Sequence, residues 1–126
     1  MLMKTATDLI DEAKERITEV TPQQTMQIRA EHPSTVVIDC REPNEWNLGR
    51  VPGATFLPRG TLETNIEAVV SREQKVIIYC ASGNRSALAA DTLQQMGYVD
   101  VASMSGGFRG WAEAGGDIDG RGHGPG

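Results

Sequence analysis

The feature that most constrains the fold of this chain is a short apolar segment that runs directly into a cysteine-containing loop and then into a helical pattern. Residues 76–79 read Val-Ile-Ile-Tyr, a continuous apolar run typical of a strand buried on both faces. Cys80 follows at once, and a helix-like run begins near Ser86. This order is typical of a parallel α/β sheet, in which ligands bind at the carboxyl ends of the strands.

Composition narrows the class of protein. A length of 126 residues supports one domain with a buried core, and the net charge of −5 argues against the basic surface that nucleic acid requires. Charged residues interrupt the first twenty positions and no later stretch is long enough to span a bilayer, so we expect a soluble, cytoplasmic protein without a membrane partner. Neither cysteine has the spacing of a zinc site, and His32 and His123 lie far from Cys80, so no metal and no cofactor are predicted.

The chain divides into three segments. Residues 1–20 are expected to form an amphipathic helix packed on the domain, because apolar residues recur at helical spacing, namely Leu9, Ile10, Ala13, Ile17 and Val20. Residues 21–114 form the domain itself. Residues 115–126 are rich in glycine and have almost nothing to bury, which predicts a disordered tail, in which His123 is simply solvated. The oligomeric state stays open, since the first helix could cover its own domain or pair with a neighbour.

Strands and helices alternate through the domain. The sequence predicts strands at 35–39, 55–57, 75–79 and 99–104, and helices from Thr21 to before Pro33, at 42–48, at 61–70, after the cysteine loop as far as Gly97, and at 108–114. Helix 61–70 is expected to bury one face, made of Leu62, Ile66, Val69 and Val70. The alternation indicates a parallel α/β sheet, with Asp39 and Cys80 at strand ends.

The loop after Cys80 favours a chemical function for the thiol. A buried cysteine is often only a small apolar residue. Here, however, small residues allow backbone amides to turn inward, Gly83 can take a positive φ, and Arg85 can close the loop or bind its anion. The amides and the start of the helix favour a thiolate and bind anions. We therefore expect Cys80 to be the nucleophile and the following residues to form an anion-binding loop, namely Ala81, Ser82, Gly83, Asn84, Arg85 and Ser86.

Three motifs in register resemble the rhodanese family of sulfurtransferases. Residues 80–86 resemble its active-site loop, a cysteine, four residues, an arginine and a serine or threonine. Residues 39–41 with 45–46 and 49–54 resemble its earlier signature, and residues 106–111 its closing one. The resemblance covers about residues 21–114. It implies a three-layer fold with a central, mostly parallel five-stranded sheet and helices on both faces.

The resemblance also implies a reaction. Cys80 would take the outer sulfur of thiosulfate or of a persulfide donor, hold it as a persulfide, and pass it to cyanide or another thiophilic acceptor. Inward-pointing amides suit a persulfide anion, and a thiolate needs no general base. The implied partners are a small-molecule donor and acceptor, with an acceptor protein as an alternative.

Five further residues are given supporting or access roles. Arg41 and Glu45, four positions apart, are expected to form a structural ion pair, and Asp39 to support the loop. Arg59 resembles an arginine at the mouth of the site in some single-domain relatives, although a solvated turn explains it nearly as well. Arg50 departs from the family, which more commonly has histidine there, and is expected to affect substrate access.

Cys40 is unusual as well, since many relatives have an aliphatic residue there. Asp39 and Cys40 point to opposite faces of a strand, so Cys40 is expected to pack in the core, and a redox pair with Cys80 is the lesser hypothesis.

Two other functions stay open. A phosphatase or arsenate reductase of the same fold class also uses a cysteine and arginine loop, but with five intervening residues instead of the four between Cys80 and Arg85. A rhodanese-like module that only docks a partner or senses an anion would not need the thiol. The natural sulfur donor and acceptor cannot be read from the sequence.

Overall fold

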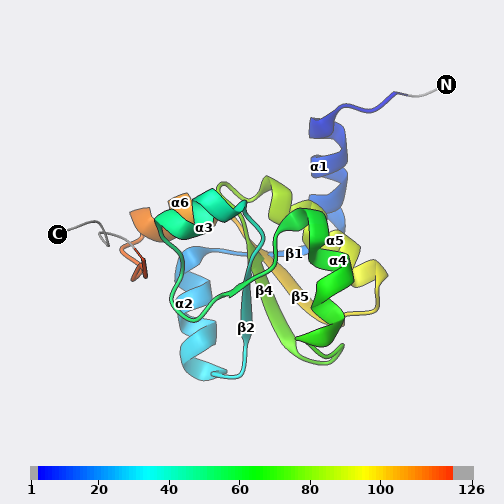
Figure 1. Ribbon diagram of the computed structural model, residues 1–126. Coiled ribbons are helices and arrows are strands. Elements are labelled where there is room, and N and C mark those ends of the chain that lie inside the picture. The colour runs from blue at the N-terminus through cyan, green and yellow to red at the C-terminus, as the bar shows by residue number, and fades with distance from the viewer. Residues whose placement is uncertain (1–2, 121–126) are drawn as a thin grey trace.

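A parallel sheet forms the centre of the computed structural model, which describes residues 3–120. Its five strands lie in the order β1-β5-β4-β2-β3, and every pair of neighbours runs parallel (Figure 1). The strands are β1 Thr18–Val20, β2 Val36–Asp39, β3 Thr55–Phe56, β4 Lys75–Tyr79 and β5 Asp100–Met104. The expected α/β architecture is confirmed.

Helices cover both faces of the sheet (Figure 1). They are α1 Ala6–Arg16, α2 Pro22–Glu31, α3 Pro43–Leu48, α4 Leu62–Asn65, α5 Asn84–Gln95 and α6 Gly107–Glu113, with short 3₁₀ turns at Arg59–Thr61 and Ile66–Ala68. Residues of α4 and α5 pack on one face, and α1 packs on α5. Residues of α2 and α6 pack on the other face.

Side chains alternate along the strands and divide the core in two. Ile38, Ile78 and Val101 face α4 and α5, in a cluster that also contains both cysteines. Val37, Ile77 and Met104 belong to the cluster on the α2 and α6 side, together with Tyr79 and Trp111. Cys80 therefore lies on the α5 side of the sheet.

Local sequence signals account for several helix ends. Thr21 caps α2 through a reciprocal capping box: its hydroxyl accepts from the Gln24 amide at 3.0 Å, and the Gln24 side chain accepts from the Thr21 amide at 2.8 Å. Gly97 follows α5 at φ +94°, a conformation that suits glycine at a helix end. Both signals were correctly interpreted from the sequence.

The first twenty residues do not form one helix. The expected helix ends at Arg16, and residues 18–20 form the edge strand β1, paired with residues 102–104 of β5. Ile17 already has extended backbone angles. The prediction was wrong here because pairing with a distant strand, which helical spacing cannot reveal, determines the conformation.

The expected helix at 61–70 is also shorter. Only Leu62–Asn65 is α-helical, and the chain continues as a 3₁₀ turn at Ile66–Ala68. The tighter turn has about three residues per turn, so the 3.6-residue spacing no longer applies. Leu62, Ile66 and Val70 are buried as expected, whereas Val69 is 52% exposed.

The start of the glycine-rich tail is ordered, contrary to the sequence prediction. The Gly116 amide donates to the Trp111 carbonyl at 3.0 Å, and Arg50 and Asp119 pair through their backbones at 2.9 Å in both directions. Residues 121–126, and with them His123, lie outside the described residues.

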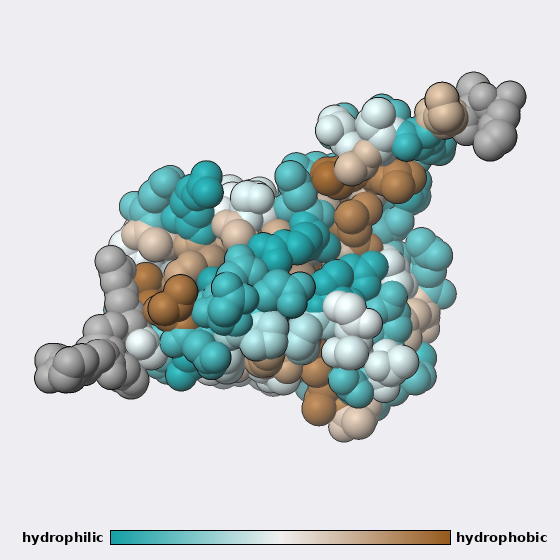
Figure 2. Space-filling view, turned by 45° about the horizontal axis from the view of Figure 1, so that its top comes forward, coloured by the Kyte–Doolittle hydropathy of each residue, from teal (hydrophilic) through white to brown (hydrophobic). Residues whose placement is uncertain are grey.

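The first helix projects beyond the domain at its N-terminal end (Figure 1). Apolar residues are visible along it in Figure 2, and Leu9 is 47% exposed. At the other end, Arg16 makes two hydrogen bonds, of 3.0 and 2.8 Å, with the Asp91 carboxylate of α5. Among residues 3–120, no helix has both the length and the apolar character needed to cross a membrane.

Candidate active site

Cys80 lies between the end of β4 and the start of α5, and its side chain is almost fully enclosed. Its Sγ accepts hydrogen bonds from the amides of Gly83 at 3.2 Å and Ser86 at 3.3 Å. The Ser86 hydroxyl oxygen lies 3.5 Å from the same sulfur. The loop thus places two amide donors and one hydroxyl group beside a single sulfur atom.

Gly83 makes this geometry accessible to the chain. Its φ of +102° lies in the left-handed region, which residues with a side chain rarely adopt. A Cβ at this position would also lie only 3.3 Å from the Gly106 nitrogen. The positive φ expected from the sequence is present, and it turns the loop amides toward Sγ.

The environment lowers the pKa of the Cys80 thiol. Burial alone would raise this pKa, because it disfavours the charged thiolate. The Ser86 hydroxyl and the amides of Ser86, Gly83 and Ser82 oppose burial by donating to the sulfur, and the net pKa falls below the ordinary value. A thiolate is the more nucleophilic form of cysteine, so the loop activates Cys80.

Arg85 closes the loop from the outside. Its guanidinium forms a bidentate ion pair with the Glu45 carboxylate of α3: Nη1 donates to Oε1 at 2.9 Å and Nη2 to Oε2 at 3.1 Å. The hydrogen bond from Arg85 lowers the pKa of Glu45 to about 2. The sequence predicted that Glu45 would pair with Arg41, and that prediction was wrong. Residue 42 is the N-cap of α3 with extended backbone angles, so positions 41 and 45 do not lie one helical turn apart.

Arg41 instead pairs with Asp39, and this buried pair supports β4 from the other face of the sheet. The Arg41 Nη2 donates to the Asp39 carboxylate at 2.7 Å and to the Gly49 carbonyl at 2.6 Å. The Tyr79 hydroxyl donates to the same carboxylate at 2.6 Å. Tyr79 precedes Cys80, so Asp39 holds the strand end from which the loop starts. Tyr79 was not among the predicted site residues, although its place beside Cys80 in the sequence was an available signal.

Two glycines bring α6 against the cysteine loop. The amides of Phe108 and Arg109 donate to the carbonyls of Cys80 at 2.8 Å and Ala81 at 3.2 Å. Gly107 has a φ of +56°, and a Cβ there would collide with the Cys80 carbonyl and the Ala81 backbone. The Gly-Gly pair at 106–107 therefore permits close approach, and the resulting bonds fix the backbone of the loop.

The two arginines expected near the mouth make other contacts. Arg59 pairs with Glu63 at 3.0 Å and reaches Thr92 Oγ1 at 3.4 Å. Arg50 donates to the Trp46 carbonyl at 3.0 Å, and its guanidinium lies 4.7 Å from the centre of the Trp46 ring. Among the hydrogen bonds of residues 3–120, neither arginine reaches the loop.

The remaining loop residues form its outer edge. Ser82 and Asn84 are exposed, and Ala81 is half-buried.

Cys40 is completely buried and shares the apolar cluster of Cys80, as expected of a core residue. Within the described part of the chain, no three His, Cys, Asp or Glu side chains gather as the ligands of a metal ion would.

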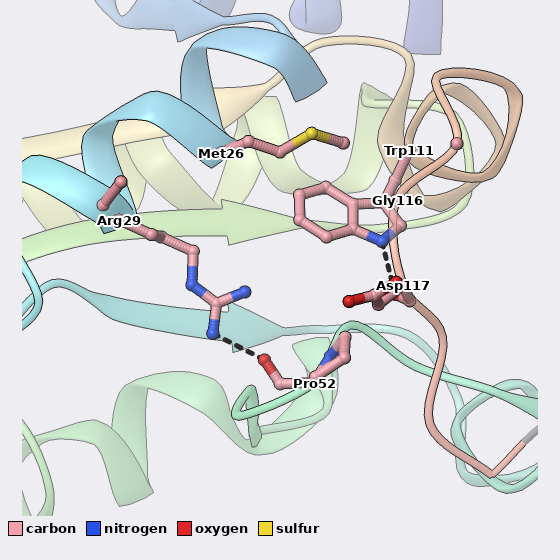
Figure 3. Close-up of a pocket in the computed structure, with 8 residues that line it drawn as sticks. Met26, Arg29, Pro52, Trp111, Gly116 and Asp117 are labelled. Carbon is pink, nitrogen blue, oxygen red and sulfur yellow. Dashed lines mark hydrogen bonds between the residues drawn. The ribbon is translucent and has the colours of Figure 1, made fainter.

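A cavity of about 390 Å³ lies apart from the cysteine loop, between α2, the turn at Pro52 and the end of α6 (Figure 3). Arg29 Nη2 donates to the Pro52 carbonyl at 2.6 Å on one side of it. On the other, Trp111 Nε1 donates to the Asp117 carbonyl at 2.7 Å. No residue of the loop lines this cavity, so it is separate from the candidate active site.

Fold and site together define a parallel α/β domain that carries an activated cysteine in a loop of backbone amides. The chain belongs to the rhodanese-like domain family, whose family model matches residues 21–114. A thiosulfate sulfurtransferase GlpE of Tolumonas auensis is 37% identical over 79 residues, covering 63% of this chain and 74% of that protein. A mitochondrial protein of Schizosaccharomyces pombe, provisionally named a thiosulfate sulfurtransferase, is 32% identical over 92 residues. That match spans 64% of this chain and 65% of the relative's length.

Solved structures with a similar fold were also found. A Rhodopseudomonas palustris protein of unknown function, described as a possible tyrosine phosphatase, has a TM-score of 0.84 and 35% identity, covering 94% of this chain and 97% of its own. The homodimeric polysulfide-sulfur transferase of Wolinella succinogenes has a TM-score of 0.80 and 26% identity, with 93% of this chain and 88% of its own covered. Both similarities extend beyond the cysteine loop to nearly the whole described domain.

Proposed function

We propose that this protein is a sulfurtransferase that moves the sulfane sulfur of thiosulfate, or of a persulfide donor, through a persulfide on Cys80. The observation that carries the proposal is the cradle around Cys80 Sγ, with amide donors at 3.2 and 3.3 Å and a lowered pKa. Relatives named for thiosulfate and polysulfide sulfur transfer support it.

The proposed reaction has two displacement steps. The Cys80 thiolate attacks the outer sulfur of thiosulfate, a new S–S bond forms, and the old S–S bond breaks with its electron pair leaving on sulfite. Cyanide or another thiophilic acceptor then attacks the outer sulfur of the persulfide. With cyanide, thiocyanate leaves and the Cys80 thiolate is regenerated. No external oxidant or reductant is required.

The loop suits both charged forms of the sulfur. Its amides point inward before the reaction begins, so they stabilise a thiolate or a persulfide anion with little reorganisation. A free thiol survives best in a reducing compartment, so we propose a cytoplasmic setting. The acceptor is either a small thiophile or the thiol of an acceptor protein.

Phosphate chemistry is the main enzymatic alternative, and the name of the R. palustris neighbour raises it. An arginine that binds phosphate must direct its donors into the loop. Here Arg85 directs one donor of Nη1 and one of Nη2 to Glu45 of α3, at 2.9 and 3.1 Å, and among the described residues no hydrogen bond joins its side chain to the loop. This arrangement favours sulfur over phosphate.

The test is sulfur loading followed by discharge. Mass spectrometry of purified protein after thiosulfate treatment should find one added sulfur atom on Cys80, and cyanide should remove it as thiocyanate. Cys80→Ala should do neither. Absence of loading in folded wild-type protein would contradict the proposal and favour an anion-sensing or docking module. Turnover of an aryl phosphate that is lost in Cys80→Ala would favour the phosphatase instead.

A further inference from the structure

A second buried hydroxyl stands behind the one that contacts the sulfur. Ser86 Oγ lies 3.5 Å from Cys80 Sγ and 2.8 Å from the Oγ of Ser103. Both serine residues are completely buried. Ser103 belongs to β5 and pairs in register with Ile78, two positions before Cys80. The side chains of Ser103 and Cys80 therefore lie on the same face of the sheet. Ser103 of β5, Ser86 of α5 and Cys80 form a chain of contacts that ends at the sulfur.

The number of protons sets the direction of this chain. Each serine hydroxyl has one proton to donate, while a thiolate can only accept. When Ser86 donates its proton to the sulfur, it has none left for Ser103, so Ser103 must donate to Ser86. Ser103 makes no other side-chain hydrogen bond among the described residues, which leaves Ser86 as its acceptor.

We propose that Ser103 is a positioning residue for sulfur transfer: its hydroxyl donates to Ser86 Oγ and so directs the Ser86 proton at the sulfur of Cys80. The expected effect on sulfur transfer rests on the proposed function. The expected effect on the pKa of Cys80 does not, because that pKa is measured in the resting protein without any turnover.

The chain favours the charged form of the sulfur for two reasons. A hydroxyl that receives a hydrogen bond is polarised and becomes a better donor itself. If a neutral thiol instead donated to Ser86 Oγ, one of the two serine protons would be left buried without an acceptor. Only the direction that ends on the sulfur uses both serine protons, and a thiolate is the stronger acceptor.

Other charged and titratable groups surround the cysteine loop, and a substitution at Ser103 leaves all of them in place. Cys40 directly follows β2, and its pKa responds to the charge of Cys80 and to those of Asp39, Arg85 and Arg59. Asp39 ends β2, Arg85 belongs to α5, and Arg59 follows β3. Helix α6 brings Arg109, whose amide bonds the loop. Replacing Ser103 changes none of these groups, so a change in the titration of Cys80 reports on the hydroxyl chain.

The experiment measures the Cys80 thiol directly. The carbon NMR shift of Cys80 Cβ, followed across pH in cysteine-labelled protein, gives its pKa without any turnover. In Ser103→Ala we expect the equilibrium to move about threefold toward the neutral thiol, as weakening one bond of a cooperative chain would cause. The matched control is Ser105→Ala, which removes a hydroxyl bonded to the Val20 carbonyl at 3.2 Å and should leave the titration unchanged.

A second pair of variants separates the hydroxyl from the packing. Threonine and valine have nearly the same shape, so Ser103→Thr and Ser103→Val differ only in the hydroxyl. The threonine variant should titrate like wild type, and the valine variant like Ser103→Ala. This pair also decides the question if Ser103→Ala fails to fold.

Sulfur loading supplies the functional readout. In Ser103→Ala, loading from thiosulfate should slow at low pH and approach the wild-type rate at high pH, where the thiolate forms without help. Unchanged Cys80 titration in folded Ser103→Ala and Ser103→Val would overturn the proposal, as would slower loading without a pKa shift. If wild type loads no sulfur, the proposed function fails, and the NMR titration still decides the role of Ser103.

Discussion

Cys80 combines deep burial with a lowered pKa, two properties that ordinarily oppose each other. The opposition is resolved by hydrogen bonds from the Ser86 hydroxyl and from the loop amides. Burial would keep water away from the proposed persulfide, and the donors favour the charged form of the sulfur. The reactivity proposed for Cys80 therefore depends on the loop as much as on the thiol.

The pH dependence of sulfur loading should follow the thiolate. Because the folded environment lowers the pKa of Cys80, the rate should rise with pH and level off below the range of an ordinary cysteine. Ser86→Ala removes the hydroxyl donor and should slow loading about tenfold on the low-pH side of the profile. Stopped-flow measurement of sulfite release across pH checks both. A profile for Ser86→Ala that coincides with wild type would contradict this role.

Cys40 should be dispensable for sulfur transfer. Burial raises its pKa above the ordinary value, so the thiol stays protonated and is a poor nucleophile. Cys40→Ala should retain sulfur loading and lose about 1 kcal/mol of stability, since it removes one buried atom from a packed cluster. Thiocyanate production and urea unfolding measure the two effects. A Cys40–Cys80 disulfide in wild type after mild oxidation would instead support the redox pair.

At the scale of elements, the cysteine loop is held in place by helix α6. Helix α6 lies far from β4 in sequence, yet its first amides bind the carbonyls of Cys80 and Ala81. The Gly-Gly motif at its start was recognisable from the sequence as a tight turn. That the same glycines allow two backbones to approach closely is visible only when α6 and the loop are both in place.

Gly107→Ala should therefore disrupt the site by direct collision, although Gly107 lies far from Cys80 in sequence. The new Cβ would collide with the Cys80 carbonyl and would also force alanine to φ +56°. We expect a loss of roughly 3 kcal/mol and a large fall in sulfur loading, because the loop must move. The control is Gly115→Ala, which has φ +81° with nothing within 4 Å and should lose only about 1 kcal/mol. Equal effects in thermal unfolding would argue against the collision.

At the scale of the whole molecule, the loop is anchored by contacts with α3 and by the polar pair that holds the end of β4. Arg85 ties it to α3 through Glu45, while Asp39 and Tyr79 hold the end of β4 in the other half of the core. Segments from four parts of the chain thus converge on one strand end. Stability and activity should be linked for this reason.

Acid should weaken the tie between α3 and the loop. The folded pKa of Glu45 is about 2, below that of an unfolded glutamate, so the stabilisation is present above the unfolded value and is lost as pH falls toward 2. Glu45→Gln should lower the free energy of unfolding by about 1 kcal/mol at neutral pH, with discounting for partial exposure. Its difference from wild type should shrink in acid.

Urea unfolding at several pH values measures this difference. The matched control is Glu12→Gln, which breaks the exposed pair with Lys4 and should have little effect at any pH. A Glu45→Gln variant that stays equally destabilised in strong acid would show that packing, not charge, is responsible.

The features determined by the sequence alone are those that depend on near neighbours. The strand before Cys80, the positive φ of Gly83, the capping box of Thr21 and the alternation of strands and helices follow from local geometry and apolar spacing. The amide cradle belongs to this group, because one short loop provides all its donors.

Only the tertiary structure decided which distant groups meet. It paired Arg85 with Glu45 and Arg41 with Asp39, made residues 18–20 an edge strand, and brought Ser103 to Ser86. Each of these contacts, apart from that of Arg41, joins segments more than fifteen positions apart. Their energy comes from pairing and burial once the sheet has formed, and no periodicity along the chain records which partner will be nearest.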